Sequence, residues 1–583
     1  MEVSETVETD VLVIGAGGAG MRGAIAVAAA GLKVAVVCKS LLGKAHTVMA
    51  EGGAACALAN VAELDSWQTH FADTMNGGKL LNNWRMAEIH AREAPERILE
   101  LERWGAIFDR NRHGLIHQRS FGGHTYPRLA HIGDRTGLEL IRALQDHLVH
   151  QDKVDVFMET TATALVVRDG RVVGALAYRR SDARLILFRA HAVLLATGGW
   201  GKIYRVTSNS WECTGDGTAL AYRAGAELQD CEMVQFHPTG MVWPPGVKGI
   251  LVTESVRGEG GLLRNSEGDR FMETYDPQRM ELSTRDVVSR AINQEVNEGR
   301  GSPHGGVFLS VTHLDGTYVK RRLPSMWEQF HKLAGIDITR EPMEVAPTIH
   351  YAMGGVRVEA ETGGTNLEGL YAAGEVACGL HGANRLGGNS LSDLLVFGKR
   401  AGDAAAAYAQ DHPSLPGADM RLVAGHVERM EAPLHRDGES PYLLHAELQD
   451  VMTTHAPIIR DEAGLEAGLE KLLALKERAA RCGTGGPNGT AFNPGWHTAL
   501  DVQHMIANAE AVIRCAIERR ESRGAHARGD FPDYDPKLER VNFVVDQSHD
   551  GSMRVRREAK PVIPTEMMKI IETKFSLDYE RQD

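Results

Sequence analysis

The sequence of 583 residues has few cysteines, and none of them is closely paired with another. There are seven cysteines, and none belongs to a C-x-x-C motif. Zinc sites, iron–sulfur clusters and disulfide reductases use such pairs, so the sequence indicates no metal or cluster site and excludes a redox disulfide. The odd number and wide scatter of the cysteines are typical of free thiols in a reducing compartment.

Long apolar runs and signal-peptide features are also missing. The longest apolar stretch, AIAVAAAGLKVAVV, is interrupted by Gly31 and Lys33 and is too short to cross a bilayer. The first ten residues, MEVSETVETD, are acidic and polar, unlike a signal peptide. We therefore expect a soluble chain that reaches a membrane only through a partner.

The basic residues do not collect into a run. With a formal net charge of −13, this distribution argues against nucleic acid as a partner. A small anionic substrate is still possible, because a local group of Arg and His can oppose the overall charge. The length predicts two to four packed units, and the 63 glycines indicate tight turns or a close approach of backbone to ligand.

A glycine motif follows the first buried strand. The segment TDVLVIGAGGAG predicts a strand over 11–14 and a turn that opens an alanine-rich helix. Gly15 permits the tight turn, Gly17 lets the backbone approach a pyrophosphate, and Gly20 lets helix and strand pack closely. The free N–H groups of the helix would then face the phosphates. This context predicts a dinucleotide site.

The residues after the second strand, 33–38, favour FAD over NAD. An acidic residue usually binds the ribose there, but Cys-Lys-Ser stands at 38–40. Two further strand–glycine segments, HAVLLATGGWG (191–201) and LEGLYAAGEVACG (367–379), lie far downstream. Glu375 in the latter could accept a hydrogen bond from a ribose or ribityl hydroxyl. Ordinary βα turns would explain these glycines but not the A-x-G pattern that the segments share, so we expect one interrupted FAD domain.

The remaining segments complete the predicted fold. The insertion at 236–352 begins and ends at His-containing loops, where a mobile cap would hinge. Apolar residues at helical spacing predict a helical domain at 421–530, and the turn-rich tail at 531–583 contains one expected strand. The expected class is α/β: a Rossmann-like FAD-binding domain (1–235 and 353–420) interrupted by an α+β capping domain, then the helical and a small C-terminal domain.

The motifs taken together resemble the flavoprotein subunit of the succinate dehydrogenase/fumarate reductase family. They occur in the family order from residue 9 to about 532, which is nearly the whole chain. The motifs are HTVMAEGG, ATGG, TGDG, QFHPTG, TESVRGEGG, RDVVSR, HYAMGG, AGE, GANRLGGNSL and ESRGAHARGDFP.

The resemblance implies that His46 carries FAD covalently, through a ring nitrogen bound to the 8α-methyl group of the flavin. Such a bond should raise the flavin potential, which would help the flavin accept hydride from a poor reductant such as succinate. In the segment 381–398, a helix N-terminus could present N–H groups to the pyrimidine edge of the flavin. The other residues expected at the cofactor are Gly15, Gly17, Gly18, Gly20, Lys39, Ser40, Thr47, Glu51, Gly52, Gly53, Asp216, Glu375, Asn389, Ser390 and Leu391.

The resemblance also implies a site for a C4 dicarboxylate, which needs a cationic or donor group at each end. The residues that would hold the two carboxylates are His237, Thr253, His350 and Arg385. Arg385 suits a bidentate grip that Lys could not provide.

Succinate oxidation also requires a proton acceptor on the face opposite the flavin. By resemblance this is Arg285, with Glu254 and Arg257 as its relay. Anion clamping alone is the alternative role for Arg285 and Arg257. Because Arg normally stays protonated, the implied step is a transient deprotonation through the carboxylate of Glu254.

The resemblance leaves the physiological direction open. We favour succinate oxidation, although Glu51 stands where dehydrogenases of the family tend to have Gln, and fumarate reduction is the alternative. L-Aspartate oxidase is more remote, because it matches poorly at the HT motif. Electrons leaving FAD need further redox centres to carry them to an acceptor. The resemblance therefore implies two partners: an iron–sulfur subunit, and a membrane anchor with a quinone site. The expected location is the cytoplasmic side of a bacterial or archaeal membrane.

Overall fold

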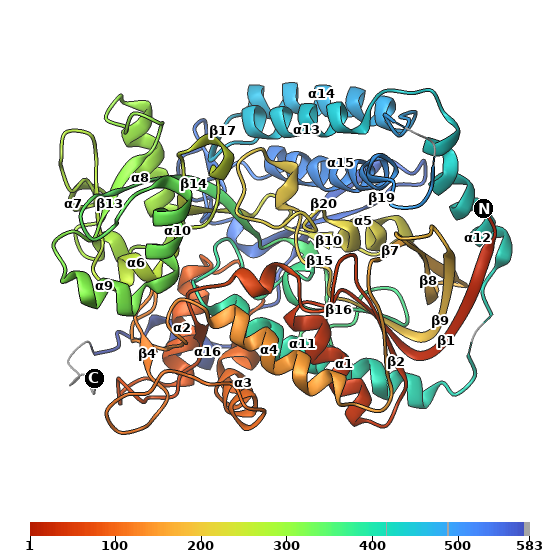
Figure 1. Cartoon of the computed structure of the whole chain (residues 1–583), viewed down its shortest axis with the longest axis horizontal. Coiled ribbons are helices and arrows are strands. Elements are labelled where there is room, and N and C mark those ends of the chain that lie inside the picture. Colours follow the sequence, from red (N-terminus) through yellow and green to blue (C-terminus); the bar gives the residue numbers. More distant parts are fainter. Residues whose placement is uncertain (416, 487–488, 577–583) are drawn as a thin grey trace.

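The computed structural model describes residues 1–415, 417–486 and 489–576 and contains a seven-stranded mixed sheet (Figure 1). The strand order is β6-β2-β1-β9-β8-β7, with β16 beside β9. Strands β2 and β9 run parallel to β1, and β16 runs parallel to β9, whereas β8 is antiparallel to β9. The bounds are β1 Val3–Ile14, β2 Val34–Val37, β6 Val154–Phe157, β7 Thr160–Arg168, β8 Arg171–Arg179, β9 Leu185–Leu195 and β16 Leu370–Ala372.

Alternate side chains of β1 enter two different cores. Val11 and Val13 pack on one face with α1, α3, α4 and α11, whereas Leu12 and Ile14 pack on the other with α5 and α13–α15. Both faces of this part of the sheet are therefore covered, which explains its continuous apolar run. These helices are α1 Gly18–Ala29, α3 Trp84–Arg103, α4 Thr136–Val149, α5 Asp216–Ala224, α11 Asn389–Asp411, α13 Pro441–His455, α14 Glu462–Ala479 and α15 Pro494–Glu518.

Strand β1 is longer than the expected strand at 11–14. It begins at Val3 and pairs with β9 as far as Leu185. The acidic segment that preceded the glycine motif in the sequence is therefore an extension of the sheet. Its polar residues were not recognised as a strand because most side chains of 3–8 remain partly or fully exposed.

The residues of the predicted insertion form a second, antiparallel sheet of order β11-β14-β13-β12 with its own apolar core. The strands in which the inserted segment begins and ends, β11 Val234–Met241 and β14 Met343–Ala352, pair with each other. In Figure 1 this region, in green, projects from one end of the molecule. Its motion as a cap stays a prediction. The other elements are β12 Leu262–Arg264, β13 Val307–Ser310, α6 Ser255–Gly258, α7 Met272–Tyr275, α8 Arg285–Asn297, α9 Gly316–Arg322 and α10 Pro324–Ala334.

The C-terminal segment is joined to the rest of the chain through a sheet of order β15-β10-β19-β20. The expected strand at 541–545 is confirmed, but β20 and α16 were missed, and residues 577–583 of the predicted domain lie outside the described residues. The bounds are β10 Leu228–Gln229, β15 Gly355–Val356, β19 Val541–Gln547, β20 Met553–Ala559 and α16 Thr565–Glu572. The remaining elements are α2 Trp67–Gly77, α12 Met420–Glu431, β3 Ala54–Ala55, β4 Gln118–Arg119, β5 Leu129–Ala130, β17 Ile459–Arg460 and β18 Ala527–Arg528. No helix within the described ranges is long and apolar enough to cross a membrane.

Candidate active site

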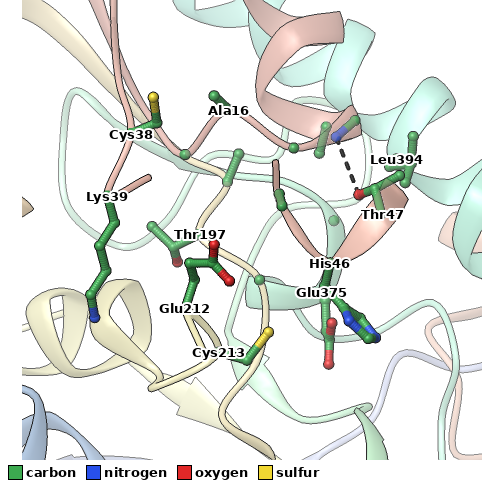
Figure 2. A pocket seen from close by; sticks show the side chains of 18 of the residues that line it. Ala16, Cys38, Lys39, His46, Thr47, Thr197, Glu212, Cys213, Glu375 and Leu394 are labelled. Atoms are coloured by element: carbon green, nitrogen blue, oxygen red, sulfur yellow. Dashed lines mark hydrogen bonds between the residues drawn. The ribbon is translucent and has the colours of Figure 1, made fainter. Parts of the chain in front are cut away.

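A large cavity lies where the parallel strands β1, β9 and β16 end (Figure 2). It contains about 1340 Å³ of space between protein atoms, part of it open to solvent. Figure 2 shows Cys38 and Lys39 towards one side of the cavity and His46, Thr47 and Glu375 towards the other. The residues from the sequence prediction that line it are Gly15, Gly17, Gly18, Lys39, Ser40, His46, Thr47, Asp216, Glu375, Ser390 and Leu391.

The glycine turn has the close contacts that the motif predicts. Gly15 has φ +110°, and a Cβ there would lie 2.2 Å from the carbonyl oxygen of Ala196. A Cβ on Gly20 would lie 1.8 Å from the carbonyl oxygen of Gly15, so Gly20 serves helix packing and does not line the cavity. The Gly18 N–H at the start of α1 donates to Thr47 Oγ1 at 3.3 Å, the dashed line in Figure 2. Backbone N–H groups at this helix terminus suit a pyrophosphate.

Lys39 replaces the usual ribose acid and is held firmly. Its ammonium donates to Thr214 Oγ1 at 2.8 Å, Asp216 Oδ2 at 2.9 Å and Asp501 Oδ1 at 2.7 Å. Asp216 and Asp501, with His504, are also close enough together to hold a cation. Lys39 already supplies that positive charge, so these acids do not indicate a metal.

His46 lies in a single short turn, His46–Met49, with its ring at the cavity. Burial, and then the charges of Arg385 and Lys202, lower the pKa of His46 to about 4, so the imidazole is neutral at physiological pH. Asn209 Nδ2 lies 3.4 Å from His46 Nε2 and donates to the His350 carbonyl oxygen at 2.8 Å. Asn209 was not predicted from the sequence.

Glu375 lies at the same end of the cavity. Its Oε1 accepts the N–H of Ala352 at 3.0 Å, which ties the end of β14 to the cofactor domain. Burial raises the pKa of Glu375 to about 7. The protonated carboxyl can therefore donate as well as accept near neutral pH.

Four other predicted cofactor residues do not line the cavity. The Asn389 side chain bonds to His70 and Thr74 instead. Glu51 is enclosed nearby, and burial, with the Asp134 carboxylate adding to it, raises its pKa well above the usual range. Gly52 and Gly53 follow Glu51, and a Cβ on Gly52 would lie 2.5 Å from the Phe121 ring. Contact of these four residues with a cofactor stays a prediction.

The cavity lining fits FAD. The glycine turn and the α1 terminus suit the pyrophosphate, and Glu375 suits a hydroxyl. The start of α11, with Ser390 and Leu391, lies at the end where His46 and His350 also line the cavity. Helix α11 begins at Asn389, within the segment 381–398 where the sequence predicted a helix N-terminus, and its N-terminal dipole suits the electron-rich edge of a flavin.

Next to His46 and His350 lies a buried group of charges. Arg285 Nε donates to Glu254 Oε2 at 2.8 Å, and Arg257 Nη2 lies 3.5 Å from the same oxygen. The other carboxylate oxygen of Glu254 accepts the N–H of Gly122 at 2.7 Å. Burial alone would raise the pKa of Glu254, but Arg285 and Arg257 outweigh it and lower the pKa. The structure thus brings the three predicted relay residues into contact.

The predicted carboxylate-binding residues surround this group. The ring centroids of His237 and His350 are 5.1 Å apart, and those of His46 and His350 are 6.1 Å apart. Arg385 Nη1 donates to Ser390 Oγ at 2.7 Å. Thr253, which precedes Glu254 in the sequence, is buried, and its hydroxyl lies 3.2 Å from Ser255 Oγ.

Several nitrogen atoms of this cluster have no hydrogen-bond partner in the protein. Among the described residues, His237 Nε2, Arg385 Nε and the Nε and Nη2 of Arg257 are buried without a hydrogen bond. Burial, and then the charge of Arg285, lower the pKa of Arg385 to about 9 and hold those of His237 and His350 well below the usual range. The histidines are therefore neutral, and Arg257, Arg285 and Arg385 outnumber the single carboxylate of Glu254. Such a pocket is suited to an anion with more than one negative charge.

Sequence reasoning also missed Gln235 and Tyr351. Gln235 Oε1 accepts from Arg285 at 3.2 Å, and its Nε2 donates to the Arg385 carbonyl oxygen at 2.7 Å, so it joins the two arginines. The Arg385 guanidinium lies 4.5 Å from the centre of the Tyr351 ring. Both residues belong to motifs of the sequence analysis, QFHPTG and HYAMGG. Their position within two residues of His237 and His350 in the sequence is the signal that could have identified them.

The fold and the site define an FAD-dependent oxidoreductase acting on a small anion. Residues 10–391 match the family model described as "FAD binding domain", and residues 445–575 match "Fumarate reductase flavoprotein C-term". The chain belongs to the succinate dehydrogenase/fumarate reductase flavoprotein family.

Relatives named as fumarate reductases and relatives named as succinate dehydrogenases are both similar to this chain over nearly its full length. One chain of the fumarate reductase (CoM/CoB) of Methanothermobacter marburgensis is 47% identical over 92% of this chain and 97% of its own. A "Succinate dehydrogenase flavoprotein subunit" of Rickettsia felis is 39% identical over 90% of each chain. The solved structure "Mycobacterium smegmatis Sdh1 in complex with UQ1" is 52% identical, with a TM-score of 0.86 over 96% of this chain and 95% of its own.

Proposed function

We propose that this chain oxidises succinate to fumarate as the flavoprotein subunit of a succinate dehydrogenase. The observation that carries the proposal is the cluster of buried Arg285, Arg385 and His237 with the partly buried His350, beside the cofactor cavity. Arg385 and His350 would bind one carboxylate, and His237 and Thr253 would bind the other. Charge-assisted hydrogen bonds from buried arginines would orient the dianion for reaction.

Oxidation removes a hydride and a proton from adjacent carbons of succinate. FAD, when bound, supplies the acceptor for the hydride. Arg285 would first pass a proton from its Nε to Glu254 Oε2, 2.8 Å away, and would then accept the proton of succinate in its place. Arg257, 3.5 Å from that oxygen, would take the proton from Glu254 as it releases one of its own towards solvent. Anion clamping alone is the competing role for Arg285 and Arg257.

We further propose that His46 carries FAD covalently. The imidazole lines the cavity and is neutral, because burial lowers its pKa to about 4. Neutral imidazole is the nucleophilic form. Asn209 beside Nε2 would fix the ring plane.

Fumarate reduction is the second candidate, and two observations favour it. Glu51 stands where dehydrogenases of the family tend to have Gln, and burial raises the pKa of its carboxyl well above the usual range, which favours the protonated form that resembles Gln. The relative from M. marburgensis is named a fumarate reductase. The same residues would then bind fumarate, and Arg285 would deliver the proton. A dehydrogenase remains our first proposal.

Electrons would leave through partners. The described residues include no cluster ligands of the C-x-x-C kind, and the M. smegmatis structure is named as a complex with UQ1. We propose an iron–sulfur subunit bound to this chain and a membrane anchor with a quinone site. The chain would then be peripheral, on the cytoplasmic side of a bacterial or archaeal membrane.

The test is anaerobic reduction of the purified FAD-loaded protein. Succinate should bleach the oxidised flavin absorbance, and malonate should block the bleaching. Fumarate-dependent reoxidation of the reduced protein, measured alongside, sets the ratio of the two directions. A fully FAD-loaded protein that shows neither reaction would contradict the dicarboxylate function.

A further inference from the structure

Three histidines outside the dicarboxylate site bond to a single turn, residues 387–392, which opens α11. His70 and His90 are buried, and His124 is partly buried. His70 of α2 lies with Nε2 2.9 Å from Asn389 Oδ1. His90 of α3 lies with Nε2 2.8 Å from Ser392 Oγ. His124, in the loop after β4, lies with Nε2 2.8 Å from the Gly387 carbonyl oxygen. The His70 ring is 5.0 Å from that of His90 and 6.0 Å from that of His124.

The partners define each histidine as a donor. The Gly387 carbonyl can only accept, so Nε2 of His124 carries the proton. Ser392 Oγ lies 3.2 Å from the Asn389 carbonyl oxygen, so its hydroxyl donates there and accepts from His90.

The third histidine follows the same pattern. Asn389 Nδ2 donates to Thr74 Oγ1 at 3.0 Å, which leaves Oδ1 to accept from His70. Burial lowers the pKa of His90 to about 3 and that of His124 to about 4 and holds that of His70 well below the usual range, so all three are neutral. Within the described residues, their Nδ1 atoms are buried without a hydrogen bond. Each ring therefore makes one hydrogen bond to protein, and that bond goes to the 387–392 turn.

Other bonds also restrain the turn, among them that of the Ala55 N–H to the Gly388 carbonyl oxygen at 3.1 Å, and the turn serves both sites. The residue before α11, Gly388, has φ +85°, and no side chain caps the helix. Ser390 lines the cofactor cavity and accepts from Arg385. A Cβ on Gly387 would lie 2.5 Å from the Phe121 ring and 3.1 Å from Glu254 Oε2. The backbone that His124 holds is therefore in close contact with the carboxylate of the proposed proton relay.

We propose that His70, His90 and His124 are positioning residues: as neutral donors they fix the 387–392 turn, and through it they place Arg385 and Ser390 for the dicarboxylate and the flavin. The proposal rests on the proposed dicarboxylate function. It assigns these histidines no contact with either ligand.

The first test compares His124→Leu with His124→Gln in the FAD-loaded protein. Malonate binding is measured from the change in the flavin spectrum. Loss of the donor in His124→Leu should weaken malonate binding about tenfold, the equivalent of one neutral hydrogen bond. Gln can present an N–H near the position of Nε2, so His124→Gln should bind malonate within about threefold of the wild type. His455→Leu is the matched control, because His455 Nδ1 also bonds to a backbone carbonyl, that of Gly464, far from the turn.

The outcomes separate this proposal from the function. A wild-type protein that gives no malonate response would contradict the dicarboxylate site itself. The positioning role would be overturned if the wild type binds malonate and His124→Leu, with its FAD retained, binds malonate equally well. If His124→Leu does not fold, His124→Asn replaces it, since its amide is too short to reach the Gly387 carbonyl. Equal malonate binding by His124→Asn and His124→Gln would again overturn the proposal.

Discussion

Replacing Arg285 by Gln tests the proton path most directly. Arg285 makes two buried side-chain contacts, to Glu254 at 2.8 Å and to Gln235 at 3.2 Å. Gln cannot accept and release a proton in the same way, so Arg285→Gln should bind dicarboxylate but turn over very slowly. Loss of a positioned proton-transfer group reduces rates by about 10²–10⁴-fold.

The cost in stability can be judged from the partners that remain. Removing one member of a buried ion pair costs about 3–5 kcal/mol when the other charge is left alone. Glu254 keeps the N–H of Gly122 at 2.7 Å and Arg257 at 3.5 Å. We therefore expect the free energy of unfolding to fall by about 3 kcal/mol, the low end of that range. The variant should stay folded and retain FAD.

The assay is anaerobic stopped-flow reduction of the flavin by succinate, with malonate affinity measured on the same sample. Arg385, His237 and His350 remain, so malonate should bind within about tenfold of the wild type. Arg290→Gln is the matched control: Arg290 lies on the same helix, α8, and bonds to Asp286 at 3.2 Å and to the Gly524 carbonyl oxygen at 2.7 Å. Flavin reduction within about threefold of the wild-type rate in Arg285→Gln would remove Arg285 from the proton path.

Three further changes address the cofactor and the histidines. His46→Ser should retain FAD that acid precipitation releases, lose succinate oxidation and keep some fumarate reduction; full succinate oxidation would refute the link between the covalent bond and the flavin potential. Asn209→Ala removes the amide beside His46 Nε2 and should lower the covalently bound fraction, read as flavin fluorescence in a denaturing gel, while noncovalent FAD binding persists. His90 has its pKa lowered to about 3, so the unfolded chain, with a His pKa of about 6.5, binds the extra proton between these values and stability falls as the pH falls. The free energy of unfolding of His90→Leu should therefore change less steeply with pH between about 4 and 6, by roughly 1.4 kcal/mol per pH unit; parallel curves for the two proteins would contradict the buried neutral state.

The features that local physics determines could be predicted from the sequence. Glycine is required at position 20 because a Cβ there would meet the Gly15 carbonyl oxygen, and at position 15 because a Cβ there would meet that of Ala196, directly after β9. The motif formed by these glycines therefore identified the turn and the dinucleotide fold. The relay of Arg285 and Glu254 was recognised only through the family motifs. Their contact, across 31 positions of sequence, depends on the tertiary packing that brings the start of α8 to the residue before α6.

Asn209 and the three histidines could not be predicted in this way. His70 and Asn389 are separated by 319 positions, and His46 and Asn209 by 163. Nothing in the local sequence distinguishes a histidine that donates to a distant turn from one that simply packs in a helix. The tertiary arrangement of α2, α3 and α11 creates that role, just as β10 and β15 give the C-terminal strands their place in a sheet.

The shared turn has a thermodynamic consequence for the proposed enzyme. Arg385 binds Ser390, and Ser390 lines the cofactor cavity, so a dicarboxylate that draws Arg385 towards itself must alter the contacts of that serine. Any change that dicarboxylate binding makes in the flavin potential must be matched by an equal difference in dicarboxylate affinity between the oxidised and reduced protein, because the coupling between two binding equilibria is reciprocal. If the 387–392 turn carries this coupling, loosening it in His124→Leu should reduce the malonate-induced shift in flavin potential as well as malonate affinity. A variant with weakened malonate binding but an unchanged shift at saturating malonate would show that the two sites communicate by another route.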